Sequence, residues 1–241
     1  NPFENMLHYR LHHDPKSSHQ QISSQVRRLN RQPVLDVGTA QGFLGQLLEG
    51  SGLQVDAVEP NPEWADAARP FYRELFAATV EEVQLPAKTY RVVVCGDVLE
   101  HVVNPQQALE TLMEATTDDA IFIVSLPNVA HLAVRLMLLF GLFPHMERGI
   151  LDRTHLHFYT RATAQSMLES AGLQVVRATP TGVPLDEILS RLKGRAVFDV
   201  LMRAQHLLLK IAPRLFAFQW IFVAKKADFT LNKAQDAQKS R

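Results

Sequence analysis

The sequence predicts an α/β fold with a doubly wound, mostly parallel sheet, and three observations support that prediction. The run 92–95 is fully apolar and β-branched, as is typical of a strand buried on both faces of a parallel sheet. The stretch 34–42 passes from an apolar strand into a glycine-containing turn, and a helix opens at Phe43. Strand and helix patterns then alternate along 34–128, as they do when helices connect parallel strands.

Local signals justify the elements in order. The first strand is predicted at 34–37, and a second apolar run, 53–58, ends on the acid Glu59. Asn61 and Pro62 then mark a helix start, because asparagine suits the N-cap and proline suits the first helical position. Further apolar runs are predicted as strands of the same sheet: 75–79, 92–95, 120–126, 173–176 and 219–224.

The domain organisation follows from the spacing of these runs. A chain of 241 residues fits one domain, which we expect at 34–227, between an N-terminal leader (1–33) and a flexible tail (228–241). Two segments break the strand–helix rhythm: 129–160, predicted as an inserted lid, and 181–218, predicted as a helical insertion before the last strand.

The glycine spacing after the first strand indicates what kind of ligand the turn binds. Asp36, Gly38 and Gly42 give the spacing D-x-G-x-x-x-G, whereas dinucleotide folds carry G-x-G-x-x-G. Glycines let backbone N–H groups approach a ligand closely, and an acid placed like Glu59 accepts hydrogen bonds from a ribose diol. The pattern predicts a nucleoside-cofactor site; the alternative is ordinary turn glycines in another strand–helix–strand protein.

The same stretch resembles motif I of the class I S-adenosylmethionine (SAM) methyltransferases. Residues 92–105, VVVCGDVLEHVVNP, are similar to a motif of the ubiquinone-pathway and type 11, 12 and 23 methyltransferase-domain group of bacteria. Residues 149–160 resemble a motif of bacterial methyltransferases associated with cell-surface sugar and polysaccharide pathways. The resemblance covers 34–176 and the strand near Trp220, and it implies a seven-stranded Rossmann-like methyltransferase sheet.

The resemblance implies that SAM is the cofactor and S-adenosylhomocysteine (SAH) the product. The turn residues Gly38, Gln41 and Gly42 would then shape the methionine pocket. Asp36 would support this turn, and Glu59 would bind the ribose hydroxyls. In relatives the leader before the first strand folds over the cofactor; the alternative for 1–33 is a solvated N-terminal helix.

The adenine end departs from the family pattern. Relatives usually end the third strand on an Asp near the adenine amino group, and that place falls here on Thr79. The resemblance therefore implies an adenine contact through the Thr79 hydroxyl or the Val80 backbone N–H, with Asp97 at the methionine end. Thr39 and Ala40 also stand where motif I usually carries Cys or Gly.

Two histidines are the candidate catalytic residues. Methyl transfer from a sulfonium is an in-line displacement, so positioning supplies most of the rate, but a hydroxyl acceptor also needs a base within hydrogen-bond reach. His101 is the leading candidate because its motif places it at the carboxyl end of a central strand, and His155 is second. The alternatives are a helix-capping or packing role for His101 and a hydrogen bond within the insertion for His155.

The acidic cluster around His101 raises a metal alternative. Some small-RNA and ubiquinone-pathway O-methyltransferases hold a divalent metal with an acid-x-x-Glu-His cluster, similar to Asp97-x-x-Glu100-His101 here. His155 or His157 would complete such a site for Mg²⁺, Mn²⁺ or Zn²⁺. Many metal-free relatives carry the same letters, so we assign no metal to the site.

The acceptor is inferred from the family resemblance alone. It implies a hydroxyl of a sugar or of a lipid-linked glycan precursor. A quinone-like phenol or another small molecule is the first alternative. The second is a catalytically silent SAM-binding subunit that docks on a partner through 181–218.

Charge and hydropathy indicate the surfaces. The formal net charge of zero gives no support for nucleic-acid binding, yet 191–226 holds eight Lys/Arg against one acid, a local net of +7. The apolar run 131–143 is predicted as a core or lid helix, with a peripheral membrane contact or a homodimer interface as alternatives. One helical face of 198–210 is predicted to be apolar and the other polar: Phe198, Leu201, Met202, Leu208 and Leu209 against Asp199, Arg203, His206 and Lys210.

The single cysteine, Cys95, lies inside a predicted buried strand and cannot form an internal disulfide. This suits a reducing cytoplasm, with peripheral attachment at the inner membrane as the variant that the basic segment suggests. No apolar run reaches the roughly 18 residues that span a bilayer, and no signal peptide is recognised at the start of the sequence.

Overall fold

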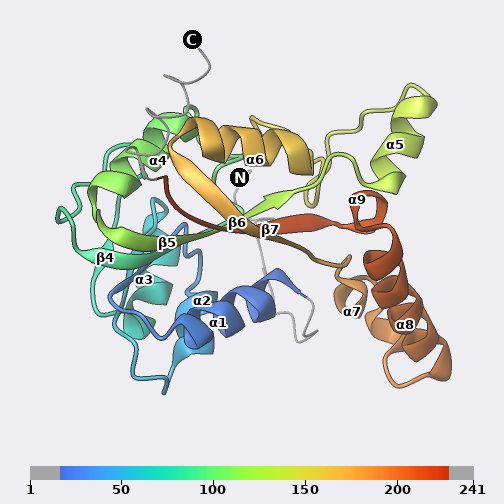
Figure 1. Ribbon diagram of the computed structural model, residues 1–241. Helices are drawn as coiled ribbons and strands as arrows, with labels where there is room; N and C mark the ends of the chain where they lie inside the picture. Colours follow the sequence, from blue (N-terminus) through green and yellow to red (C-terminus); the bar gives the residue numbers. More distant parts are fainter. Residues whose placement is uncertain (1–16, 228–241) are drawn as a thin grey trace, which may run out of the picture.

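The computed structural model describes residues 17–227, and the strands among them form one seven-stranded sheet in the order β3-β2-β1-β4-β5-β7-β6 (Figure 1). The pairs from β3 to β5 are parallel, and β7 runs antiparallel to both β5 and β6. This confirms the predicted α/β class. Residues 1–16 of the predicted leader and the predicted tail, 228–241, lie outside the described residues.

The strands have these bounds: β1 Val34–Val37, β2 Val55–Val58, β3 Leu75–Phe76, β4 Tyr90–Gly96, β5 Thr116–Pro127, β6 Leu173–Pro180 and β7 Gln219–Lys226. The helices are α1 Ser18–Leu29, α2 Phe43–Leu48, α3 Pro62–Ala68, η1 Arg69–Phe71, α4 Pro105–Glu114, α5 Leu132–Leu139, α6 Arg161–Ser170, α7 Leu185–Ile188, η2 Ser190–Leu192, α8 Ala196–Ile211 and α9 Pro213–Phe216. Every predicted strand is present, and β5, β6 and β7 are longer than the apolar runs that predicted them.

Helices cover both faces of the sheet (Figure 1). On one face, Ile22 and Val26 of α1 and Leu44 of α2 pack against β1, β2 and β4. On the other face, α4 and α6 cover β4, β5 and β7 in the larger part of the core. The strands β1, β2 and β4 are buried on both faces of the sheet. Their side chains therefore face apolar surroundings on either side, and their sequences do not alternate between apolar and polar residues.

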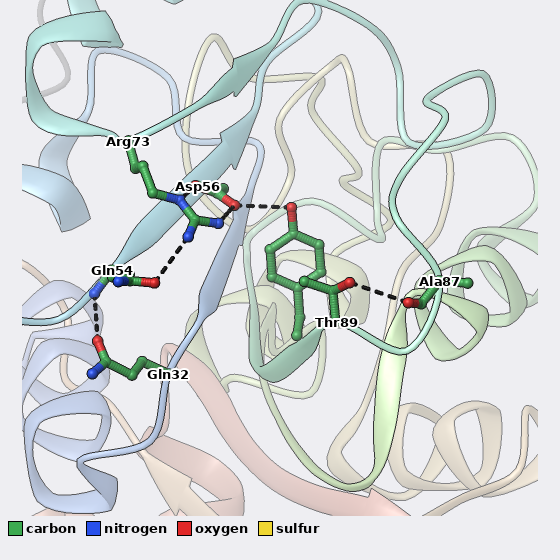
Figure 2. Close-up of polar contacts among 7 residues, drawn as sticks. Gln32, Gln54, Asp56, Arg73, Ala87 and Thr89 are labelled. Atoms are coloured by element: carbon green, nitrogen blue, oxygen red, sulfur yellow. Dashed lines mark hydrogen bonds and ion pairs between the residues drawn. The ribbon is translucent and has the colours of Figure 1, made fainter.

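A buried polar cluster ties the starts of three strands together (Figure 2). The fully buried Asp56 on β2 accepts hydrogen bonds from Arg73 Nη2 at 2.6 Å and from Tyr90 Oη at 3.0 Å. Arg73 also donates a hydrogen bond to the Gln54 side-chain oxygen. The backbone N–H of Gln54 in turn donates to the side-chain oxygen of Gln32. This cluster lies at the starts of the strands, so it stabilises the sheet away from the carboxyl ends, where ligands bind.

The two predicted insertions extend from one end of the molecule (Figure 1). The first follows the carboxyl end of β5 and contains α5; its base packs around Val134, Ile150, Leu151 and the neighbouring Phe218. The second, 181–218, contains α7, α8 and α9 and leads into β7. Within the described residues, no helix combines the length and apolar character needed to cross a bilayer.

Candidate active site

The turn between β1 and α2 uses glycine at two positions. Gly38 has a φ of +69° and Gly42 a φ of +84°, both in the left-handed region that favours glycine. A Cβ at Gly38 would lie 2.5 Å from Val98 Cγ2, and one at Gly42 would lie 2.9 Å from Phe71 Cδ2. The turn therefore lies directly against the segments that follow β4 and precede β3, as a turn at the carboxyl ends of parallel strands should.

Glu59, just beyond the end of β2, clamps this turn from the side. Its Oε2 accepts the backbone N–H of Ala40 at 2.8 Å, and its Oε1 accepts that of Asn61 at 2.9 Å. Burial raises the pKa of this carboxyl, while the two backbone donors oppose the shift. Each carboxylate oxygen has a second lone pair, so Glu59 can hold the turn and still accept a ribose hydroxyl.

Asp36 supports the turn through Tyr72, a residue that the sequence did not indicate. The Tyr72 hydroxyl donates to Asp36 Oδ2 at 2.6 Å, accepts the Gly45 N–H at 3.0 Å and also hydrogen-bonds the Thr39 hydroxyl. Burial raises the pKa of Asp36 to about 6, against the lowering effect of the hydrogen bonds from Tyr72 and Thr39. Tyr72 thus satisfies a free N–H in the first turn of α2, whose N-cap Gly42 offers no side chain.

Asp97 follows β4 and is fixed to the two neighbouring strands. Its φ of +56° turns the backbone sharply at the edge of the sheet. The Ser125 hydroxyl donates to Oδ1 at 2.7 Å, and Gln219 Nε2 donates to Oδ2 at 2.6 Å. Ser125 and Gln219 were not predicted, because they come from β5 and β7 and reach Asp97 only in the folded sheet.

The residues predicted for the adenine end lie in the turn that follows β3. The Thr79 hydroxyl donates to Glu82 Oε2 at 3.2 Å, and Val80 is buried in the core. The end of β3 is joined to the ribose side, because the Glu59 N–H donates to the Phe76 carbonyl at 3.0 Å. The contacts of Thr79 and Val80 with adenine, and of Gln41 with the methionine part, remain predictions.

The two candidate histidines meet at the carboxyl edge of the sheet. The rings of His101 and His155, from segments far apart in the sequence, have centroids 4.8 Å apart in an edge-to-face arrangement. His155 Nδ1 lies 3.1 Å from the Ile150 carbonyl, and His101 Nδ1 lies 3.3 Å from the Thr154 carbonyl. The structure therefore brings together the two residues that sequence reasoning had proposed separately.

These carbonyls decide which nitrogen of each ring carries the proton. A carbonyl oxygen only accepts, so the Nδ1 that faces it must donate, and the neutral ring then keeps its lone pair on Nε2. Burial lowers the pKa of His155, and the nearby His101 lowers it further. A neutral imidazole with an available Nε2 is the form that a general base requires.

Glu100 completes a cluster with these histidines. Its carboxyl is fully buried, and among the described residues neither oxygen has a hydrogen-bond partner. Burial raises its pKa well above the usual range, and the charges of Asp97 and Asp152 act in the same direction. One ligand atom each from Glu100, His101 and His155 lie within 4.8 Å of one another, so these three residues could hold a divalent cation.

The other members of the predicted metal set do not join that cluster. The Asp97 carboxylate is occupied by Ser125 and Gln219. His157 Nε2 points to the Val102 carbonyl at 3.1 Å. The backbone of the first insertion is nevertheless hydrogen-bonded to the segment that follows β4, because the Glu100 carbonyl accepts the N–H groups of residues 156 and 157.

Comparison with known proteins identifies the domain. A family model described as a methyltransferase domain matches residues 7–178. The ubiquinone biosynthesis O-methyltransferase of Rickettsia canadensis is 29% identical over 115 residues, covering 45% of this chain and 48% of that protein. The mitochondrial enzyme of the same name from Schizosaccharomyces pombe is 29% identical over 131 residues, covering 51% and 47%. The chain thus spans about half the length of the curated relatives it matches.

Solved structures agree on the fold. A SAM-dependent methyltransferase from Archaeoglobus fulgidus superposes with a TM-score of 0.59 at 18% identity, covering 87% of this chain and 95% of that one. Magnesium protoporphyrin IX methyltransferase from Synechocystis, solved with bound SAH, superposes with a TM-score of 0.58 at 16% identity. This match covers 87% of this chain and 82% of that one. SAM is the cofactor that these findings support. By its match over most of its length, the chain belongs to the methyltransferase-domain family.

Proposed function

We propose that this protein transfers a methyl group from SAM to a hydroxyl of a small-molecule acceptor. The observation that supports this most strongly is the pair His101 and His155, held together at the carboxyl edge of the sheet, where ligands bind in such folds. Both rings offer Nε2 as the proton acceptor that a hydroxyl nucleophile needs. A silent SAM-binding subunit would need no such pair, so the cluster favours an enzyme.

In the proposed site each residue has a defined task. Gly38 and Gly42 let the turn approach the methionine part of SAM, and Glu59 accepts hydrogen bonds from the ribose. Asp97, fixed by its two partners, positions the methionine end. His155, neutral at physiological pH, takes the acceptor proton as the oxygen attacks the methyl carbon and SAH leaves.

For the acceptor, the relatives favour a phenol-like hydroxyl. The similar proteins are named as O-methyltransferases of ubiquinone biosynthesis, which makes a quinone-like acceptor the better-supported class. The sugar or lipid-linked glycan expected from the sequence has no such support among the relatives, and we keep it as the second candidate. A homodimer and a cytoplasmic location are further proposals that neither the structure nor the relatives test.

The metal alternative concerns the same residues. Glu100 fits a cation, because both of its buried oxygens lack a partner among the described residues. A divalent cation held by Glu100, His101 and His155 would supply electrostatic stabilisation of an acceptor oxygen. Chelation with EDTA separates the two readings. Unchanged turnover supports imidazole bases, whereas loss of turnover that Mg²⁺ or Mn²⁺ restores assigns the cation.

The base assignment is tested with His101→Gln and His155→Gln, assayed with labelled SAM against phenolic acceptors and against glycan-lipid extracts. We expect the essential base variant to lose about 10²-fold or more in kcat while SAM binding by calorimetry is retained. Because the pKa of His155 is lowered, its base form is lost only as pH falls below the ordinary histidine value of about 6.5. The acid limb of kcat/KM should therefore lie below that pH. Rates within about threefold of wild type for both variants would return the histidines to structural roles.

A further inference from the structure

Large apolar side chains are exposed together at the tip of the first insertion. Leu139 and Phe140, at the end of α5, are each 75% exposed. The exposed apolar residues of this tip are Leu136, Leu138, Leu139, Phe140, Leu142, Phe143 and Met146. The sequence predicted a core or lid helix here, but within α5 only Val134 is buried, so most of this apolar surface faces solvent.

A second exposed apolar surface lies on α8. The face predicted to be apolar is only partly turned inward: Leu209 is buried, and Phe198 and Met202 are half-buried. At 100° per residue, the other apolar residues form a separate stripe that faces solvent. Its members are Val197, Val200, Leu201, Leu207, Leu208 and Ile211. In the part of the chain that the structure describes, nothing packs on this outer side of α8.

The two surfaces belong to one end of the molecule (Figure 1). Phe218 packs against the cluster that contains Val134 of α5, and its ring faces His131 at a centroid distance of 6.3 Å. Phe218 comes directly after α9, and α9 packs against α8. Both insertions also leave from the carboxyl edge of the sheet, which carries the candidate active site. We call residues 136–146 and the outer stripe of α8 the apolar end surface.

Positive charge flanks the α8 part of this surface. Residues 191–214 hold six Lys/Arg against one acid, a local net of +5, while the whole chain is neutral. Arg203 and Lys210 lie at one edge of the α8 stripe, at about 40–60° from its nearest member on the helical wheel. Cations that flank an exposed apolar helical face are the pattern of helices that lie in the interface of an anionic bilayer. The same charges would repel one another across a symmetric contact between two copies of α8.

We propose that the apolar end surface docks on the surface of a bilayer that contains anionic phospholipids. Leu139, Phe140 and their neighbours enter the acyl boundary, and the outer stripe of α8 lies along it. Arg203, Lys210 and the other cations contact the headgroup phosphates. The active-site edge of the sheet then faces the membrane, which suits an acceptor held in the lipid. Docking itself does not depend on the proposed methyl transfer.

The test is vesicle flotation of the full chain, without SAM or acceptor, on phosphatidylglycerol–phosphatidylcholine vesicles and on phosphatidylcholine alone. We expect binding to the anionic vesicles that falls about tenfold or more at high salt. Two double variants, Leu139→Gln with Phe140→Gln and Arg203→Glu with Lys210→Glu, should each lose about tenfold or more of that binding. Val176→Gln is the matched control, because Val176 is 62% exposed on the edge strand β6 and should bind like wild type.

Two flotation results would overturn the docking proposal. The first is that the wild-type chain does not float with anionic vesicles at low salt. The second is that both double variants float like the wild type. A concentration-dependent dimer in sedimentation velocity that the Leu139/Phe140 variant abolishes, without vesicle binding, would assign the surface to a second copy. SAM titration of every variant is run in parallel. Retained SAM affinity with lost flotation affects docking alone, whereas absent SAM binding in the wild type would count against the proposed function.

Discussion

At the scale of single residues, the site depends on carboxylates that the fold buries and then supplies with donors. Asp36 has Tyr72 and Thr39, Glu59 has two backbone N–H groups, and Asp97 has Ser125 and Gln219. Glu100 differs, since neither of its oxygens has a partner within residues 17–227. A buried carboxyl without donors is costly to ionise, so Glu100 is the member of the site most dependent on protonation or on a bound cation.

The pH dependence of stability should reveal Asp36. Its folded pKa of about 6 lies above the ordinary 3.8, so the folded state holds the proton more tightly than the unfolded chain. Its contribution is therefore fully present below about pH 4 and is lost as pH rises through about 6. Asp36→Asn keeps an acceptor for Tyr72 and does not ionise. We expect the stability of this variant relative to wild type to rise by about 2 kcal/mol between pH 4 and 7 in urea unfolding. A difference that does not change with pH would contradict the buried, protonatable state of Asp36.

At the scale of elements, α2 begins in an unusual way. Its N-cap is a glycine in the left-handed region, and the hydroxyl of Tyr72 from the segment before β3 satisfies the Gly45 N–H. Gly45 makes this possible, because a Cβ there would lie 2.8 Å from Tyr72 Cζ. The start of α2, the end of β1 and the approach to β3 are therefore one structural unit beneath the cofactor turn.

The substitution Gly45→Ala tests that unit, because the sign of the change in unfolding free energy depends on Tyr72. Alanine normally stabilises a helix interior relative to glycine by about 1 kcal/mol. Here the methyl group must displace Tyr72 from Asp36, and we expect a loss of about 1–3 kcal/mol in the free energy of unfolding together with weaker SAM binding. Urea unfolding and calorimetry measure the two effects. A stabilised variant with unchanged SAM affinity would show that Tyr72 does not support the turn.

The Asp56 cluster makes a separate prediction for the body of the sheet (Figure 2). The Asp56 side chain is 1% exposed and that of Arg73 is 46% exposed, so removing the guanidinium leaves a buried carboxylate with Tyr90 as its remaining side-chain donor. We expect Arg73→Met to destabilise the fold by about 2 kcal/mol, less than for a fully buried pair because Arg73 is half in solvent.

Thermal unfolding of Arg73→Met should be compared with that of Arg69→Met, whose ion pair with Asp66 is exposed on both sides. The Arg69 change should cost less than about 0.5 kcal/mol. Equal effects of the two substitutions would contradict the importance of burial at Asp56.

At the scale of the whole molecule, the sequence predicts the sheet well because its central strands are buried on both faces. Such strands are apolar runs, interrupted in β1 and β2 by Asp36 and Asp56, and the glycines, Glu59 and the VVVCGDVLEH motif lie at their ends. The two histidines could be proposed from the sequence, since each belongs to a motif. Their meeting could not be predicted, because it depends on how the insertion folds back onto residues 100–103.

Other features of the site could not be predicted from the sequence, because they depend on tertiary contacts alone. Tyr72, Ser125 and Gln219 have no local signature and act only where separate strands converge. On α8, periodicity separates apolar from polar positions, but it does not say which apolar residues face the core. Leu201 and Leu208 were predicted on the same face as Leu209, and the structure exposes both of them while burying Leu209.

The central claim, a SAM cleft at the carboxyl edge of the sheet with Glu59 on the ribose, is tested most directly by titration calorimetry. The wild-type chain and Glu59→Ala are each titrated with SAM and with NAD. We predict that the wild type binds SAM in preference to NAD, and that the variant loses about 1.5–3 kcal/mol of SAM binding free energy, the scale of a hydrogen bond to a charged group. Tight binding of NAD, or an unchanged SAM affinity in Glu59→Ala, would contradict the account.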